Sequence, residues 1–65
     1  MKYKVTYIED GVITRLCELN SLIHAAHLFM NWSNEIGGTE QEYPNDVVRS
    51  TNGNKTIIIE QINTK

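Results

Sequence analysis

The chain has 65 residues, of which 40% are hydrophobic and 22% charged, and its formal net charge is −2. This balance is typical of a folded protein, and the length predicts a single small domain over residues 1–65, with room for one modest core but not for a large enclosed active site. The pI of about 5.5 argues against direct binding of nucleic acid, because domains that bind it usually have a pI above about 9.

The first two elements are predicted to form a β-hairpin. Residues 3–9 are rich in β-branched and aromatic side chains, which favour a strand. Asp10-Gly11 is typical of a two-residue type I′ turn, so residues 12–18 are expected to return as the second strand.

A two-residue turn followed by an unbroken register determines which side chains share a face of this hairpin. It pairs Val5 with Leu16, so Leu16 is expected on the face that carries the tyrosines of the first strand. Ile8, Ile13 and Cys17 are expected on the opposite face. There Cys17 fits the role of a small apolar side chain better than that of a nucleophile, which would need a neighbouring base.

The helix predicted next covers residues 22–36. Ser21 is typical of an N-cap, and Gly37-Gly38 ends the helix, with Gly37 suited to the left-handed conformation that often follows a helix. When the residues are placed at intervals of about 100°, the polar side chains fill one narrow arc. The side chains expected to face the sheet are Leu22, Ala25, Ala26, Phe29 and Ile36, with Phe29 in the core.

Two further pairs of apolar side chains flank that stripe. Leu28 and Trp32 lie on one side, and Ile23 and Met30 lie on the other. The apolar surface is wider than a helix needs in order to pack on a small sheet. Either the flanking side chains fold over the sheet edges, or one flank belongs to a partner interface, where Trp and Met are frequent anchors.

The rest of the chain is predicted to contain a loop and a second hairpin. Residues 39–45 are polar and acidic and include the only proline, so they are expected to connect the helix to the next strand. Residues 46–51 and 55–62 are expected to pair as strands around Asn52-Gly53-Asn54.

The order hairpin, helix, hairpin predicts an α+β fold with two layers, in which a four-stranded sheet of ββαββ order has the helix packed on one face. Two topologies stay open. In a β-grasp arrangement the first and last strands are central and parallel, whereas in the other arrangement the whole sheet is antiparallel.

Two surface features indicate how such a domain would work. No second helix is available to cover the sheet face away from the helix (the open face), and an exposed aliphatic patch often marks a contact surface. The alternative is a scattering of strand-forming side chains among polar ones. The aliphatic side chains expected on the open face are Ile8, Ile13, Val47, Ile58 and Ile62.

Residues 16–48 contain no Lys or Arg and carry a local charge of −5, which supplies an acidic border. The residues predicted to bind a partner are Leu28, Trp32, Ile8, Ile13, Ile58, Glu40, Glu42 and Asp46.

The sequence contains no motif for catalysis or for a bound cofactor. His24 and His27 share a helix face, but no third ligand stands at a recognisable spacing, so no metal site is predicted. The single cysteine cannot form an intrachain disulfide, and no apolar stretch is long enough to cross a membrane. We therefore expect a non-enzymatic, intracellular protein of the cytoplasm, with no cofactor and no membrane partner.

The length, the element order and the helix start Glu18-Leu19-Asn20-Ser21, followed by Ala25, resemble those of small phage-encoded inhibitors. Examples are the RNA polymerase inhibitor of T7-like phages and small anti-CRISPR proteins. The resemblance is architectural, extends over most of the chain and assigns no functional residue. It implies a phage protein with an anti-defence role, which inhibits a host or defence enzyme that processes nucleic acid. The acidic segment of this chain would then meet a basic surface of that enzyme.

Two other functions stay open. One is a homo-oligomeric regulatory or structural protein whose exposed patch is self-complementary, as a two-fold interface requires. The other is a nucleic-acid-binding domain that uses the cations of the sheet, with Lys4 and Arg15 sharing the open face.

Overall fold

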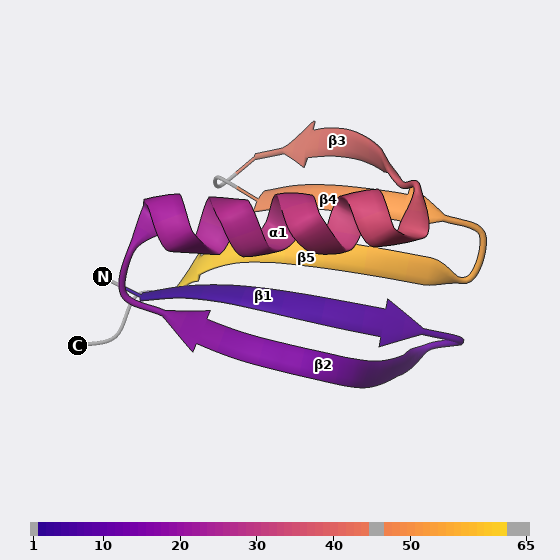
Figure 1. The fold of residues 1–65 in the computed structure, drawn as a ribbon, viewed down its shortest axis with the longest axis horizontal. Coiled ribbons are helices and arrows are strands. Elements are labelled where there is room, and N and C mark those ends of the chain that lie inside the picture. The colour runs from indigo at the N-terminus through magenta and orange to yellow at the C-terminus, as the bar shows by residue number, and fades with distance from the viewer. Residues whose placement is uncertain (1, 45–46, 63–65) are drawn as a thin grey trace.

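The computed structural model describes residues 2–44 and 47–62, and it consists of one helix packed on one face of an antiparallel sheet of five strands (Figure 1). The strands lie in the order β2-β1-β5-β4-β3 across the sheet. In chain order the elements are β1 (Lys2–Glu9), β2 (Val12–Leu19), α1 (Leu22–Ile36), β3 (Thr39–Tyr43), β4 (Val47–Asn52) and β5 (Lys55–Ile62).

The α+β class, the two layers and the bounds of the helix are confirmed, but the prediction of four strands was wrong. The additional strand is β3, which the sequence indicated as a loop. Within the described residues it pairs only with β4, at the edge of the sheet, and all five of its side chains are exposed. An edge strand that is solvated on both faces needs no apolar alternation, so its polar sequence lacks the usual strand signal.

The additional strand also decides the topology. Each further strand reverses the direction of the chain, so β5 returns antiparallel to β1, with Val5 opposite Ile59 (Figure 1). The first and last strands are therefore central, as in a β-grasp, but antiparallel. Of the two topologies that the sequence left open, the fully antiparallel sheet is the one observed.

Both hairpin turns follow their sequence signals and lie next to each other. Asp10 and Gly11 have φ values of 55° and 78°, as the predicted type I′ turn requires, and Gly53 opens the second turn with φ 61°. Because β1 and β5 are neighbours, the two turns meet. The side-chain nitrogen of Asn54 donates a 2.6 Å hydrogen bond to the Asp10 carboxylate, and the Asp10 N–H donates a 3.0 Å bond to the Asn54 carbonyl.

The register of the first hairpin differs from the unbroken one. Ile8 lies opposite Ile13, but Tyr7 lies opposite Arg15, so Thr14 is an extra residue that forms a β-bulge. Its hydroxyl donates a 3.3 Å hydrogen bond to the Tyr7 carbonyl. Beyond the bulge every side chain of β2 changes face relative to the prediction, because side chains alternate along a strand.

The bulge corrects two sequence-based placements. Leu16 was expected to face the helix, but it lies on the open face opposite Thr6 and is 55% exposed. Cys17 was expected on the open face, but it lies opposite Val5 on the helix side, where it is half-buried. Cys17 therefore packs as a small apolar side chain, as expected, but on the helix side of the sheet.

The core lies between α1 and the two central strands. Its buried side chains are Val5, Tyr7, Ala25, Phe29, Ile36, Ile57 and Ile59. Phe29 is 4% exposed, so its predicted core position is confirmed. Leu22, expected to face the sheet, is instead 56% exposed, whereas Ser33 is buried and its hydroxyl lies 2.6 Å from that of Ser50. Compared with the prediction, the helix is therefore rotated about its axis so that the Leu28 and Trp32 flank lies closer to the sheet.

Both ends of the helix are capped. The Ser21 hydroxyl accepts a hydrogen bond from the His24 N–H, and Gly37 has a left-handed conformation with φ 65°, as predicted. At the C-terminal end the Asn52 side chain also donates a 2.6 Å bond to the Ile36 carbonyl. A residue of β4 thus contributes to the cap and ties the end of α1 to the sheet.

Candidate protein-binding groove

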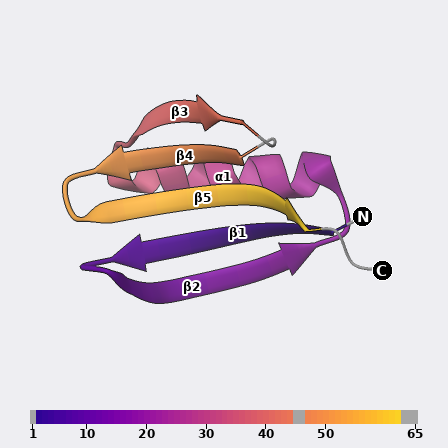
Figure 2. The ribbon, with the colours of Figure 1, turned by 180° about the vertical axis from the view of Figure 1, so that it is seen from behind.

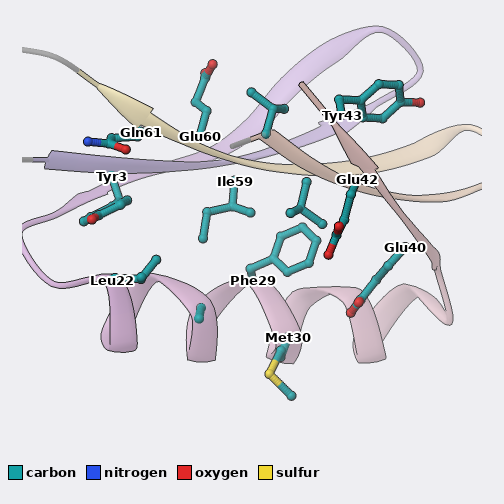
Figure 3. Close-up of a pocket in the computed structure, with 13 residues that line it drawn as sticks. Tyr3, Leu22, Phe29, Met30, Glu40, Glu42, Tyr43, Ile59, Glu60 and Gln61 are labelled. Carbon is teal, nitrogen blue, oxygen red and sulfur yellow. The ribbon is translucent and has the colours of Figure 1, made fainter. Parts of the chain in front are cut away.

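The single helix covers only part of the five-stranded sheet. It packs mainly against β5 and β1, and β3 lies beyond it at the sheet edge (Figure 1). The helix-side face of β4 and β3 therefore borders an open groove of about 640 Å³, which we call the acidic groove (Figure 3). This volume is within the range of about 300–1,000 Å³ that is usual for small-molecule sites, so the groove can take up several side chains of a partner.

One wall of the acidic groove is a stripe of apolar side chains on α1. Leu22, Ala26 and Met30 follow one another at intervals of four residues, so they stand on one side of the helix. Leu22 and Met30 are 56% and 53% exposed, and the small, half-buried Ala26 side chain stands between them. Met30 points away from the sheet and forms the outer rim (Figure 3).

The floor of the groove is part of the hydrophobic core. Phe29 and Ile59 are buried there, and Val48 packs beside them while remaining half-buried. A ligand in the groove would therefore contact side chains that the fold already holds rigidly, which lowers the entropy cost of binding.

The opposite wall is acidic. Glu40 pairs with Ser50 and Glu42 with Val48, and both partners face the helix, so strand alternation places the two glutamates on the same side. Figure 3 shows both carboxylates pointing from β3 toward α1. Among the described residues neither glutamate forms an ion pair.

The described residues that line the groove include a third glutamate but no Lys, Arg or His. That glutamate is Glu60, which points to the open face and forms a 3.1 Å ion pair with Lys4 (Figure 3). Glu40 and Glu42 therefore contribute negative charge that no cation of the described lining offsets. Apolar surface beside uncompensated carboxylates is the chemistry of a site for a ligand that is both apolar and cationic.

The Leu28 and Trp32 flank lies on the other side of the helix and is occupied by the protein itself. Both side chains are half-buried and pack against the core. The Trp32 ring meets the Tyr7 ring edge to face, with centroids 6.2 Å apart. The Arg15 guanidinium carbon lies 4.9 Å from the centroid of the Tyr7 ring and 5.6 Å from that of the Trp32 ring. Arg15 also forms a 2.9 Å ion pair with Glu35.

This closed flank depends on the bulge in β2. In an unbroken register Arg15 would face the opposite side of the sheet, so the sequence provided no reason to place its guanidinium over Trp32. Leu28 and Trp32 thus have the packing role that was the alternative interpretation of a wide apolar surface. The flank that remains exposed is that of Leu22, Ile23 and Met30.

The three predicted isoleucines do lie together on the open face, which no helix covers within the described chain (Figure 2). Ile8 pairs with Ile13 across the hairpin, and Ile58 lies diagonally across the β1–β5 pair from Ile8. Ile13 is 59% exposed, whereas Ile8 and Ile58 are half-buried among polar neighbours.

The predicted acidic border belongs to the groove and not to this patch. Glu40 and Glu42 face α1, on the opposite side of the sheet from Ile13. Asp46 lies outside the described residues. Sequence reasoning missed the groove because β3 was expected to be a loop. The one available signal was the four-residue spacing of Leu22, Ala26 and Met30.

The register places Lys2, Lys4 and Arg49 on the open face but Arg15 on the helix side, so the pair of cations that the nucleic-acid alternative put on one face is separated. Lys4 and Arg15 lie on opposite faces of the sheet, and each is paired with a glutamate. Arg49 lies over the Tyr43 ring at 5.3 Å. The expected sharing of one face by Lys4 and Arg15 was wrong, because the bulge turns Arg15 toward the helix.

Within residues 2–44 and 47–62, no three His, Cys, Asp or Glu side chains lie close enough to hold a metal ion. No helix in that part of the chain has the length and apolar character needed to cross a membrane. Comparison with known proteins finds no family model, no curated protein and no solved structure that matches this chain. The function is therefore argued from the geometry of the acidic groove.

Proposed function

We propose that this chain is a non-enzymatic protein-binding module and that the acidic groove is its binding site. The observation that carries the proposal is the contrast between the two walls. Leu22 and Met30 are exposed on α1, whereas Glu40 and Glu42 on β3 form no ion pair with another described residue. Interfaces concentrate their energy in a few apolar side chains that enter pockets, while charges at the rim select partners and speed association.

The charge of the groove supports an inhibitory role. Enzymes that process nucleic acid present basic surfaces to the phosphate backbone, and an acidic partner that covers such a surface competes with the substrate. We therefore propose an inhibitor of a host or defence enzyme of this kind, encoded by a phage and acting in the cytoplasm of the infected cell. The architectural resemblance to small phage inhibitors supports the same proposal.

Site-specific photo-crosslinking tests the assignment of the groove. A photo-reactive residue in place of Met30 is expected to crosslink to a partner protein in a lysate of host cells. The matched control carries the same residue in place of His24, which is also exposed on α1 but does not line the groove. Crosslinks that form at His24 as readily as at Met30 would show that the groove is not the binding site.

Self-association through the open face is a second candidate function. Ile13 and Leu16 are 59% and 55% exposed there on the edge strand β2, and apolar side chains exposed in this way favour contact with another surface. The mass of the protein in solution, measured by sedimentation, tests this candidate. A dimer that Leu16→Asp converts to a monomer would support it, and a monomer at high concentration would exclude it.

A further inference from the structure

We propose that the acidic groove accepts a basic amphipathic α-helix of the partner. This inference rests on the proposed function and specifies the chemistry and shape of the occupant. It is carried by three observations: the part of the sheet left uncovered, the spacing of the apolar wall and the charge of the opposite wall.

Beside the first half of α1, the sheet extends past the helix over β3 and the Val48 end of β4. Neighbouring strands lie about 4.8 Å apart, and a helix with its side chains is about 10 Å across. α1 packs mainly against β5 and β1, but its last turns also cover Ser50 of β4, whose hydroxyl meets that of Ser33, so β3 and the Val48 end of β4 are the parts of the sheet that extend beyond the helix. A second helix laid beside the first half of α1 would therefore rest on Val48 and β3 and fill the groove.

The apolar wall suits helix-on-helix packing. Side chains four residues apart form the ridges along which neighbouring helices interlock, and Leu22, Ala26 and Met30 form such a ridge. One apolar side chain of the occupant would rest on the small Ala26 side chain, between the two larger ones. Side chains one turn away on the occupant would reach Val48 and Ile59 on the floor.

The acidic wall specifies the charge of the occupant. Glu40 and Glu42 stand on β3, across the groove from α1, so they would flank the polar edge of the bound helix. Since no Lys, Arg or His is present among the described lining residues, Lys or Arg on that edge would supply the missing countercharges. A helix with acidic edges would be repelled.

A strand is the competing occupant, because β3 is an edge strand that could pair with one. Such a strand would lie outside β3 and leave the groove empty. The two occupants differ in the spacing of their apolar side chains, every third or fourth residue for a helix and every second residue for a strand. A pair of peptides can therefore separate them.

The test uses two dye-labelled peptides of about 16 residues, a length that matches α1. Both contain the same numbers of Leu and Lys, one with helical spacing and the other with alternating spacing. Fluorescence anisotropy is expected to show the helical peptide binding at least about tenfold more tightly. Equal or tighter binding of the alternating peptide would overturn the helix as occupant.

Charge reversal tests the acidic wall. Glu42→Lys is expected to weaken binding of the helical peptide at least about tenfold at low salt. Glu18→Lys is the matched control, because Glu18 is exposed on β2 and the change in net charge is the same, yet it lies away from the groove. An equal loss in both variants would mean general attraction between opposite charges and would overturn the inference. If circular dichroism shows that either lysine variant is unfolded, the Glu42→Gln and Glu18→Gln pair serves the same comparison.

The results also separate this inference from the proposed function. The helical peptide is expected to suppress the partner crosslink formed at Met30. If that crosslink forms but the peptide neither binds nor competes, the groove binds a partner of different chemistry, and only the present inference is wrong. If no crosslink is specific to Met30, the proposed function is wrong whatever the peptide does.

Discussion

The buried hydroxyls of Ser33 and Ser50 show how one polar contact positions the helix on the sheet. They lie 2.6 Å apart between the two layers, and each is the hydrogen-bond partner of the other. Gly38 passes directly over Ser50, and a side chain at that position would collide with the Ser50 hydroxyl. The contact therefore holds the last turn of α1 and the start of β3 close to β4.

Removal of one of the two hydroxyls is expected to destabilise the protein by more than the loss of one hydrogen bond, because the other hydroxyl stays buried without a partner. Ser50→Ala should lower the free energy of unfolding by about 1–3 kcal/mol, because it leaves the buried Ser33 hydroxyl without its partner. The double variant Ser33→Ala/Ser50→Ala should lose less than the sum of the two single variants. Urea denaturation of all four proteins measures the difference, and strictly additive losses would show that the hydroxyls do not depend on each other.

Phe29 and Met30 are neighbours on α1 with opposite environments, 4% and 53% exposed. Phe29→Ala should cost about 3–5 kcal/mol, which is enough to unfold a domain of this size. Met30→Ala should change stability by no more than about 0.5 kcal/mol. Thermal denaturation followed by circular dichroism compares the two, and similar melting temperatures would contradict the observed orientation of the helix.

At the scale of a single element, the bulge at Thr14 determines which face of β2 carries which side chain. It leaves Arg15 on the helix side, over Tyr7 and Trp32, and Leu16 on the open face. The sequence contains no Gly or Pro at this point that would signal a bulge. The stacked arginine and the register are therefore consequences of one extra residue.

Deletion of Thr14 is expected to be tolerated. The strand would then run without the bulge, and Arg15 would still face Tyr7, because Ile13 and Arg15 would become consecutive residues on opposite faces. Stability should change by about 1 kcal/mol, the contribution of one hydrogen bond.

Deletion of Leu16 is the matched control for this prediction. It removes a residue that is paired in the regular register, so the side chains on one side of the gap must change face, and the cost should exceed about 2 kcal/mol. Unfolding measurements and the nuclear Overhauser contacts between Arg15 and Trp32 test both variants. Loss of those contacts in the Thr14 deletion would contradict this account of the bulge.

At the scale of the whole molecule, stability is distributed unevenly across the sheet. The central strands β1 and β5 have neighbours on both sides and supply the buried side chains Val5, Ile57 and Ile59. The edge strand β3 has β4 as its one neighbour in the part of the chain that the structure describes, and all of its side chains are exposed. The acidic wall of the groove is therefore carried by the least buried strand.

Amide hydrogen exchange is expected to reveal this gradient. The slowest amides should belong to β1 and β5 and report global unfolding, whereas those of β3 should exchange through local opening at least about a hundredfold faster. A helical peptide bound in the acidic groove should slow exchange in β3, and it should also slow the slowest amides of β1, because a ligand that binds only the folded chain raises the free energy of global unfolding. Equal protection of β3 and β5 in the free protein would contradict the gradient.

The sequence by itself determined the features that depend on a few consecutive residues. The helix of α1 runs from Leu22 to Ile36 as expected, because Ser21 and Gly37 satisfy its ends locally. The type I′ turn at Asp10-Gly11 followed for the same reason, since its positive φ angles suit those residue types. The core position of Phe29 followed from the periodicity of the helix.

Only the tertiary structure decided the features that depend on pairing between distant segments. Whether residues 39–43 form a strand depends on β4, since an exposed edge strand gains its structure from its neighbour's hydrogen bonds and not from a pattern of its own. That strand reverses the direction of β5 relative to β1, leaves part of the sheet uncovered and turns Glu40 and Glu42 toward the helix. The acidic groove exists because of this long-range pairing, which the local sequence does not encode.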